Sequence, residues 1–373
     1  MLKEVFISDT NCITPLGFDV ETNMAAIESG ASAVKIHDNP VFSNKPFYGS
    51  IIDQHKIDGE FASLSPSTKY THLEKMLILA MNPIIRSAPG KRTGLILSTT
   101  KGNVSALANP VTINQAYLGE LAKTIADFFG FQTNPIVISN ACVSGIMAIA
   151  VAKRLIQSDA YDDVYIVAGD EFSKFVFSGF SSFQALSAGS CQPYSSGRDG
   201  LNLGEAAAAV HITSDKSDTS IKILGDGAIN DANHISGPSR TGEGLFKSIQ
   251  SALKEAKIQA ADIDYISAHG TATLYNDEME SVAFTRAGLQ CVPVNSYKGI
   301  YGHTLGASGL LETVVAIESA RRNKLYKSVG YDGSEMPTPI NVITENSEGE
   351  IKYFMKTASG FGGCNTAVIF EKL

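Results

Sequence analysis

One short pattern occurs twice in this chain, about 164 residues apart, and it limits the folds that the chain can adopt. Ala141–Met147 (A-C-V-S-G-I-M) follows a strand-like run and opens an apolar, helix-forming stretch, and Leu305–Leu311 (L-G-A-S-G-L-L) does the same. With the two Ser-Gly pairs aligned, the spacing is close to half of the 373 residues, as expected when two similar units are joined in one chain. A Ser-Gly pair before an apolar helix is also a common local pattern, so duplication and coincidence both stay open.

Short β-branched runs alternate with longer helical patterns along most of the chain. In the segment 241–257, Leu245, Ile249 and Leu253 recur at the spacing of one helix face, which predicts a helix packed on a sheet. Such alternation predicts an α/β fold with substantial parallel pairing. The expected strands are Val5–Ser8, Leu95–Ser98, Ile136–Ser139, Val164–Ala168, Ala207–Ile212, Ile221–Leu224, Tyr265–Ala268, Val292–Asn295 and Ala367–Phe370.

The most polar short stretch between two expected strands, Ser214–Thr219, lies near the middle of the chain. A chain of 373 residues exceeds one ordinary hydrophobic core, so two domains or two fused halves are expected. We therefore expect an N-terminal half over residues 1–214 and a C-terminal half over residues 215–373.

Charge and composition exclude several classes of protein. The net charge is −8 and the chain has no run of Lys or Arg, which argues against a nucleic-acid binder. The longest apolar runs, such as Ala206–Val210, have the length of a strand and are far too short to span a membrane. The segment Met1–Asp9 lacks the apolar core of a signal peptide. We expect a cytoplasmic protein without membrane insertion.

The five cysteines are odd in number, widely scattered and never at metal-ligand spacing. This usage is typical of a reducing compartment and makes a structural disulfide or a zinc site improbable, so no bound metal is expected. They are Cys12, Cys142, Cys191, Cys291 and Cys364.

Cys142 is the first candidate for chemistry. It follows an expected strand and precedes a run of helix formers, so it should lie at the N-terminus of a helix. Unpaired backbone N–H groups and the helix dipole stabilise a thiolate there, so we expect the pKa of Cys142 to be lowered. The same amides could bind an oxyanion. Because free cysteines are often buried packing residues, a purely structural Cys142 is an equally good interpretation of this segment alone.

Two histidines occupy matching positions. His269 ends an expected strand and is followed by glycine, which places it at the strand end where α/β sheets bind ligands. His303 lies in the glycine-dense loop 298–309, with Lys298 before it and Glu312 on the following helix. Either histidine alone is more often structural, but two in matching contexts together with Cys142 form a set that chance rarely produces.

The glycine-rich segment Ser359–Asn365 (S-G-F-G-G-C-N) precedes the last expected strand. Its glycines allow backbone amides to approach a bound group closely, which could supply a second oxyanion donor. Alone, the pattern indicates only a turn, and Cys364 is expected to pack beside that turn.

Taken together, these segments resemble the condensing enzymes of the thiolase superfamily, and most closely the elongating β-ketoacyl-[acyl-carrier-protein] synthases. The resemblance covers nearly the whole chain, and each motif follows in order. The family's A-C-S-S-G motif reads A-C-V-S-G at Ala141–Gly145, and its R-D-G-x-x-x-G-E stretch follows at Arg198–Glu205. Its H-G-T-x-T-x-x-N-D-x-x-E motif is present at His269–Glu280 and its K-x-x-x-G-H-x-x-G-A-x-G motif at Lys298–Gly309. Its G-F-G-G turn is at Gly360–Gly363.

The resemblance implies the five-layered αβαβα thiolase fold with two similar halves, obligate dimers and a decarboxylative Claisen condensation. Cys142 would accept an acyl group from the phosphopantetheine arm of an acyl carrier protein, with no tightly bound cofactor. His269 and His303 would bind the malonyl thioester carbonyl. The remaining implied roles are Lys298 and Glu312 as a supporting pair, the backbone N–H groups of Cys142 and Phe361 as the oxyanion hole, Thr271 and Thr273 as pantetheine contacts, and Phe361 as a gate.

Departures from the family pattern indicate a specialised member. Asn140 and Val143 replace a usual Thr and Ser, and Thr357–Ser359 replaces a usual N-S-F. The stretch from Gly102 to Cys142 is short, which favours the ketosynthase of a two-subunit polyketide or polyene system, as a homodimer or a heterodimer. One alternative is a non-catalytic partner that resembles a chain-length factor, which the presence of Cys142 disfavours. The other is a thiolase acting on coenzyme A esters, which His303 disfavours.

Overall fold

The computed structural model describes residues 3–67, 69–108, 112–233, 237–334 and 336–373. Its main sheet has ten strands, and the sheet divides into two sets of five with the same order and the same directions. In each set, the strand that comes first in the chain lies innermost, next to the strand that comes last in the chain. In spatial order the strands are β5 (Ile136–Ile138), β4 (Thr93–Ser98), β6 (Asp163–Asp170), β8 (Ala206–Thr213) and β1 (Phe6–Ile13), then β9 (Ile221–Asn230), β15 (Cys364–Lys372), β14 (Tyr353–Gly360), β10 (Tyr265–Ser267) and β11 (Val294–Asn295).

The strand directions repeat as well. The three outer strands of each set run parallel, β5–β4–β6 in one set and β11–β10–β14 in the other. The strand that comes last in the chain in each set, β8 or β15, is antiparallel to both of its neighbours. The two sets meet where β1 pairs with β9 over two residues, Phe6 with Lys222 and Ile7 with Ile221. The same unit is therefore built twice, and the internal repeat is a structural duplication.

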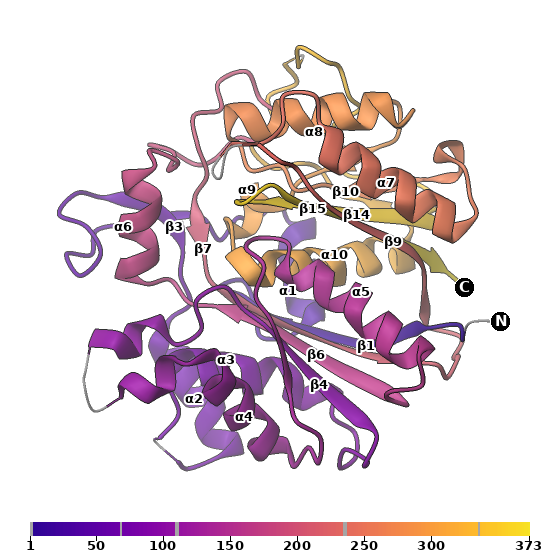
Figure 1. Ribbon diagram of the computed structural model, residues 1–373. Helices are drawn as coiled ribbons and strands as arrows, with labels where there is room; N and C mark the ends of the chain where they lie inside the picture. The colour runs from indigo at the N-terminus through magenta and orange to yellow at the C-terminus, as the bar shows by residue number, and fades with distance from the viewer. Residues whose placement is uncertain (1–2, 68, 109–111, 234–236, 335) are drawn as a thin grey trace.

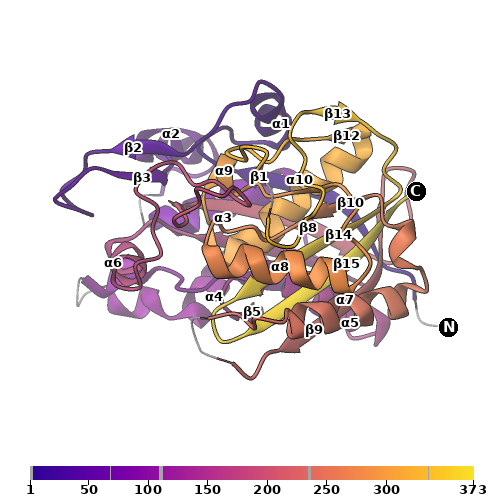
Figure 2. The ribbon, with the colours of Figure 1, turned by 90° about the horizontal axis from the view of Figure 1, so that it is seen from above.

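Helices form three layers around the two sets of strands, so that five layers stack as αβαβα (Figure 1). The central layer lies between the two sets, and its two long helices contact strands of both. From above, α7 and α8 lie over β14 and β15 (Figure 2). The central helices are α5 (Ser144–Gln157) and α10 (Ser308–Arg322). One outer layer contains α2 (Gln54–Leu64), α3 (His72–Met81) and α4 (Leu118–Phe129), and the other contains α7 (Glu243–Ala256) and α8 (Leu274–Arg286). The peripheral helices are α1 (Val20–Glu28), α6 (Lys174–Ser182) and α9 (Lys298–Tyr301).

Strands buried on both faces explain the long apolar runs in the sequence. In β8, Ala206, Ala208 and Val210 pack in the central core, whereas Ala207 and Ala209 pack in the outer core under α3. Side chains alternate between the faces of a strand, so a strand between two helical layers is mostly apolar on both faces. The predicted five-layered α/β fold with two similar halves is confirmed, and all nine predicted strands are present with shifted ends.

One main strand, β14, was not predicted, and five short strands lie at the edges. Two of them form a separate pair that contacts α10, and the other three form a small sheet. These short strands are β12 (Lys324–Leu325), β13 (Ser347–Glu348), β2 (Lys35–His37), β3 (Phe47–Ser50) and β7 (Leu203–Gly204). Among the described residues, no helix is both long and apolar enough to span a membrane.

The two Ser-Gly pairs of the repeat pack against each other. A Cβ atom on Gly145 would lie 2.5 Å from the backbone nitrogen of Leu310, and one on Gly309 would lie 2.5 Å from the backbone nitrogen of Ile146. Carbon cannot approach backbone this closely, so α5 and α10 cross at their first turns only because both positions are glycine. The glycines thus bring the loops that precede the two helices together.

We predict that Gly145→Ala destabilises the protein, because the new methyl group must push α5 away from α10. The cost should be about 2–3 kcal/mol even after the better helix propensity of alanine is counted. Gly119→Ala is the matched control, since Gly119 lies in α4 and the methyl group of an alanine there would have no atom within 4 Å. That variant should gain about 0.5–1 kcal/mol. Urea unfolding of both variants tests this, and equal stabilities would show that the crossing tolerates a side chain.

Candidate active site

Cys142 lies in a tight turn between β5 and α5. The preceding residue, Ala141, has a φ of +45°, a left-handed conformation that is costly for a residue with a side chain. The Ser144 hydroxyl holds this turn, because it accepts from the Asn140 amide at 2.7 Å and donates to the Ala141 carbonyl at 2.6 Å. Cys142 therefore precedes the first turn of α5 and is only 8% exposed. Val143, one of the departures from the family pattern, is buried in the central core.

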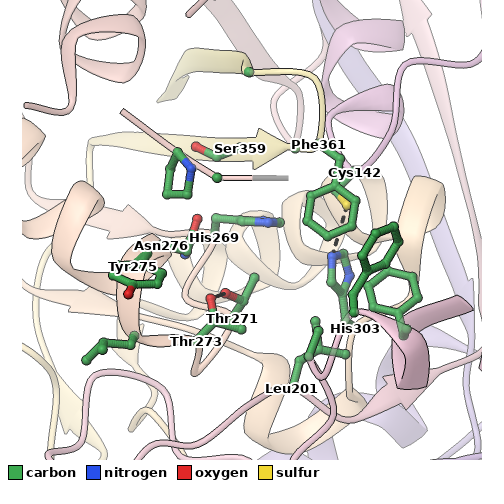
Figure 3. A pocket seen from close by; sticks show the side chains of 18 of the residues that line it. Cys142, Leu201, His269, Thr271, Thr273, Tyr275, Asn276, His303, Ser359 and Phe361 are labelled. Carbon is green, nitrogen blue, oxygen red and sulfur yellow. Dashed lines mark hydrogen bonds between the residues drawn. The ribbon is translucent and has the colours of Figure 1, made fainter. Parts of the chain in front are cut away.

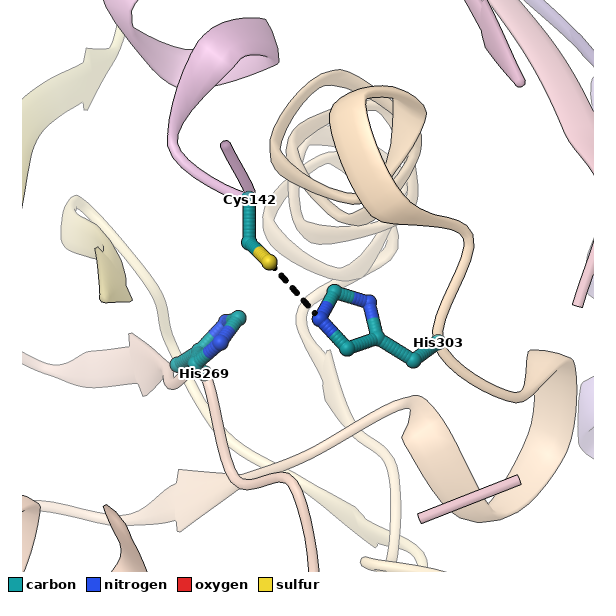
Figure 4. Close-up of side chains that lie close together, drawn as sticks. All are labelled: Cys142, His269 and His303. Atoms are coloured by element: carbon teal, nitrogen blue, oxygen red, sulfur yellow. Dashed lines mark hydrogen bonds between the residues drawn. The ribbon is translucent and has the colours of Figure 1, made fainter. Parts of the chain in front are cut away.

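His303 reaches Cys142 from the other half of the chain. Its Nε2 lies 3.1 Å from the sulfur of Cys142 (Figure 4). Its Nδ1 lies 3.2 Å from the donating amide of Leu305 and 3.0 Å from the hydroxyl of Ser308. Because a nitrogen that accepts from an N–H carries no proton in neutral imidazole, these contacts assign the proton of His303 to Nε2. The Nε2–H of His303 then points at the sulfur.

His269 completes a cluster of three side chains. It follows β10, and its backbone N–H donates to Glu280 at 2.8 Å, which fixes the end of that strand. The rings of His269 and His303 lie 5.3 Å apart at 83°. The sulfur of Cys142, one ring nitrogen of His269 and one ring nitrogen of His303 all lie within 4.8 Å of one another. Figures 3 and 4 show the three side chains together. The structure thus places together the three residues that the sequence singled out.

Burial sets the protonation of all three groups. It raises the pKa of the Cys142 thiol to about 12, with the nearby Cys364 adding to the effect and Lys298 opposing it. The prediction of a lowered pKa for Cys142 was wrong, because desolvation between the two halves outweighs the helix N-terminus. Burial also lowers the pKa of His269 and of His303 well below the ordinary value, with Lys298 reinforcing both. Both imidazoles are neutral at physiological pH.

Lys298 and Glu312 form an ion pair behind the histidines. The Lys298 ammonium lies 2.5 Å from Glu312 and donates to the backbone carbonyl of His269 at 3.0 Å. Both side chains are almost fully buried. The other oxygen of Glu312 lies 2.7 Å from the ammonium of Lys356, a residue that sequence reasoning missed. Its strand was not recognised, and a lysine inside a buried strand can be noticed only once the strand is known.

Asp170, at the end of β6, is a second residue that was missed. Its buried carboxylate accepts from the Thr99 hydroxyl at 2.8 Å, from the Thr100 amide at 3.0 Å and from the Gly306 amide at 2.7 Å. It therefore connects the N-terminal half to the turn that follows His303. A carboxylate at the end of an expected strand was the signal in the sequence.

A cavity of about 350 Å³ opens onto the three reactive groups. Thr271 and Thr273, whose hydroxyls lie 2.8 Å apart, line it together with Tyr275 (Figure 3). Phe361 also borders the cavity and is 39% exposed.

Two aromatic rings from α6 and the residue after it hold the Phe361 ring. Phe361 stacks on Phe180 at 5.8 Å and meets the ring of Phe183 edge-on at 5.7 Å. The Phe361 ring therefore lies between two other aromatic rings at the edge of the cavity.

Comparisons with known proteins agree with this architecture. The family model described as the β-ketoacyl synthase N-terminal domain matches residues 3–217, and the one described as the C-terminal domain matches residues 221–332. A Schizosaccharomyces pombe protein named as a mitochondrial 3-oxoacyl-[acyl-carrier-protein] synthase is 26% identical over 100% of this chain and 99% of its own length. A 3-oxoacyl-[acyl-carrier-protein] synthase 2 of Rhizobium meliloti is 33% identical over 63% of this chain and 60% of its own length.

Solved structures share the fold across the whole chain. The ketosynthase ApeO in complex with its chain length factor ApeC, from Xenorhabdus doucetiae, has a TM-score of 0.87 at 24% identity, covering 99% of this chain and 98% of that one. A type II polyketide ketosynthase, AntDE, in complex with its acyl carrier protein AntF has a TM-score of 0.86 at 20% identity, and both chains are covered completely. At these identities the similarity establishes the fold alone.

Proposed function

This chain belongs to the β-ketoacyl synthase family, and we propose that it catalyses a decarboxylative Claisen condensation between an acyl group on Cys142 and a malonyl unit on a carrier protein. The observation that carries the proposal is the cluster at the base of the cavity. The sulfur of Cys142 lies 3.1 Å from the Nε2 of His303, with His269 beside both. A nucleophile and two neutral N–H donors around one small space are the groups that this reaction needs.

In the loading step, the sulfur of Cys142 attacks the thioester carbonyl of an acyl-carrier protein. A new Cys142 thioester forms, the bond to the pantetheine sulfur breaks, and the thiol proton of Cys142 ends on that departing sulfur. The backbone N–H groups of Cys142 and Phe361 are proposed to hold the oxyanion. Gly360 supports this, because a Cβ atom there would lie 3.0 Å from the Cys142 nitrogen, so the two backbone segments are in contact.

In the second step, His269 and His303 donate hydrogen bonds to the thioester carbonyl of the malonyl group. The bond between the malonyl carboxylate and its neighbouring carbon breaks, carbon dioxide leaves, and the electron pair becomes an enolate. Two N–H donors held in place at a buried site stabilise that charge far more than water does. The enolate carbon then attacks the Cys142 thioester, the Cys142 thiolate leaves, and one proton restores the thiol.

The cavity also supports a substrate carried on a phosphopantetheine arm. We propose that Thr271 and Thr273 bind this arm, since their hydroxyls line the path to Cys142, and that Phe361 gates the path. No tightly bound cofactor is required. Because carrier proteins are acidic and this chain carries a net charge of −8, a local basic patch is expected to offset the repulsion. A cytoplasmic location fits this chemistry.

The chain is proposed to act as a dimer, either with its own copy or with a related synthase subunit. Exposed apolar side chains support this, since Val41, Leu107 and Phe175 border a second hollow of about 1070 Å³. We propose that the chain divides into an N-terminal half over residues 1–214 and a C-terminal half over residues 215–373. Two family models that end at residue 217 and begin at residue 221 support it.

The short stretch from Gly102 to Cys142 supports a specialised polyketide or polyene substrate over a role in primary fatty acid synthesis. The contacts of Cys364 do not support the alternative of a thiolase acting on coenzyme A esters, in which this residue would be the base. Its thiol lies 3.4 Å from the Phe361 carbonyl, its acceptor, and burial raises its pKa. A partner subunit without catalysis would have no use for the Cys142–His303 contact.

We expect the protein to form an acyl-Cys142 adduct and a 3-oxoacyl product when it is incubated with acyl- and malonyl-carrier proteins. A panel of acyl chains, followed by peptide mass spectrometry and product chromatography, measures both. Native mass spectrometry with co-expressed related subunits identifies the dimer. If no acyl chain loads onto Cys142, either alone or with a related subunit, the proposed function is wrong.

A further inference from the structure

Lys356 is a fully buried lysine that directly contacts the scaffold of the candidate site. It lies in β14, paired in register with Ser267 of β10. Its ammonium donates to the carbonyls of Ser267 at 3.2 Å and Ala268 at 3.0 Å, the two residues that precede His269. A third bond goes to its neighbour Thr357 at 2.8 Å. A lysine that directs its charge at the end of β10 influences the position of His269.

Lys356 and Lys298 hold this strand end together. The ammonium of Lys298 binds the carbonyl of His269, the next residue along the chain. Two ammonium groups therefore bind three successive carbonyls, one from β14 and one from α9. Both are paired with the same carboxylate, Glu312, at 2.7 Å from Lys356 and 2.5 Å from Lys298.

The two lysines and Glu312 do not balance in charge. Two ammonium groups share the carboxylate of Glu312, so these three buried groups carry one net positive charge when Lys356 is protonated. Burial lowers the pKa of Lys356, and Glu312 opposes that shift. The carboxylate of Glu280 offsets part of this charge, but the amides of His269 and Gly270 bind it and burial raises its pKa. The titratable groups around the two histidines are Cys142 before α5, Asp170 at the end of β6, Glu280 in α8, Lys298 in α9, Glu312 in α10 and Lys356 in β14.

The positive charge of the two lysines matters for two reasons. It opposes protonation of His269 and His303, and both lysines contribute to their lowered pKa values. A protonated histidine is also an acid strong enough to give its proton to the enolate. In that case the enolate becomes an acetyl thioester, and the carbon–carbon bond does not form. Keeping an imidazole neutral so that it donates without transferring its proton is an established electrostatic device.

We propose that Lys356 is a positioning residue that, with Lys298 and Glu312, holds the end of β10 and supplies the positive field that keeps His269 and His303 neutral donors. This inference rests on the proposed function for its chemical purpose. The electrostatic effect of Lys356 on the two histidines is independent of that function, because their protonation can be measured without any substrate.

The first test is a histidine titration by nuclear magnetic resonance. Selectively ¹⁵N-labelled protein with Lys356→Met should show His269 and His303 protonating at higher pH than in the wild type, because a nearby positive charge is gone. Lys356→Met with Glu312→Gln removes one charge of each sign and keeps the net charge of the wild-type cluster. That double variant should return both titrations toward the wild-type pH range. A merely structural lysine would not show this recovery.

Lys153→Met is the matched control. Lys153 is equally buried, and its ammonium lies 2.8 Å from Asp226 and 2.8 Å from Glu255, on the opposite end of α5 from Cys142. Its loss should lower the stability of the protein, because the buried Asp226 keeps only Arg154 as an ion-pair partner and Glu255 loses its partner Lys153, yet leave the titrations of His269 and His303 unchanged. If Lys356→Met and Lys153→Met behave alike, or if the double variant does not recover, the proposal is overturned.

The product ratio gives an independent readout. At about pH 5.5, Lys356→Met should raise the ratio of acetyl-carrier protein to 3-oxoacyl product about tenfold over the wild type, with a smaller change at pH 8. A wild-type ratio at both pH values would contradict the proposal. Absence of any 3-oxoacyl product in the wild type would instead contradict the proposed function, while the histidine titrations would still decide the role of Lys356.

Discussion

Cys142→Ala should abolish acyl loading and condensation, lowering both by a factor of about 10⁴ or more, while decarboxylation of malonyl-carrier protein continues. The two activities separate because they use different atoms. Loading needs the sulfur of Cys142, whereas decarboxylation needs only the N–H donors of His269 and His303. Alanine leaves those donors in place and removes one side chain from a cavity of about 350 Å³.

Intact-mass measurement of the acyl adduct and detection of released carbon dioxide follow the two activities in one sample. Cys364→Ala is the matched control, since Cys364 is a second buried thiol near the same turn, hydrogen-bonded to the Phe361 carbonyl at 3.4 Å. It should load normally. Acyl transfer onto the Cys142→Ala protein would remove Cys142 as the nucleophile, and loss of loading in the Cys364→Ala protein would revive the thiolase alternative.

The sequence predicted the parts of this structure that depend on local patterns. Strands buried on two faces appear as short apolar runs, so β4, β6 and β8 could be recognised without a structure. The repeated Ser-Gly pair marked the starts of α5 and α10 because a close helix crossing allows no side chain there. Cys142, His269 and His303 were found together because each follows a strand or a glycine turn that the sequence shows.

Contacts between distant segments could not be predicted in this way. In β14, Lys356 follows the apolar residues Tyr353–Met355 and precedes small and polar residues, which hides the strand until Glu312 and the carbonyls of β10 are placed around Lys356. The pKa of Cys142 was predicted in the wrong direction for a related reason. The helix N-terminus is visible in the sequence, but the burial of the thiol comes from the other half of the chain.

The second large effect concerns His303→Ala, which should lower decarboxylation by a factor of about 10² to 10³ or more and leave acylation of Cys142 largely intact. The reason is the proton on His303. Its Nδ1 accepts from the Leu305 amide, so its Nε2 is a donor that can stabilise an enolate but cannot remove the thiol proton of Cys142. The donor is lost in the variant, while the loading step still passes its proton to the departing pantetheine sulfur.

The relative loss of the two steps therefore reports which nitrogen of His303 carries the proton. Single-turnover acylation and carbon dioxide release, measured on the same protein, give both rates. His211→Ala is the control, since His211 lies in β8 outside the cavity and should change neither rate. If acylation falls as far as decarboxylation, His303 acts as the base for Cys142 and the assigned tautomer is wrong. If condensation is unchanged, His303 has no part in the reaction, and the field of Lys298 and Lys356 must act through His269 alone.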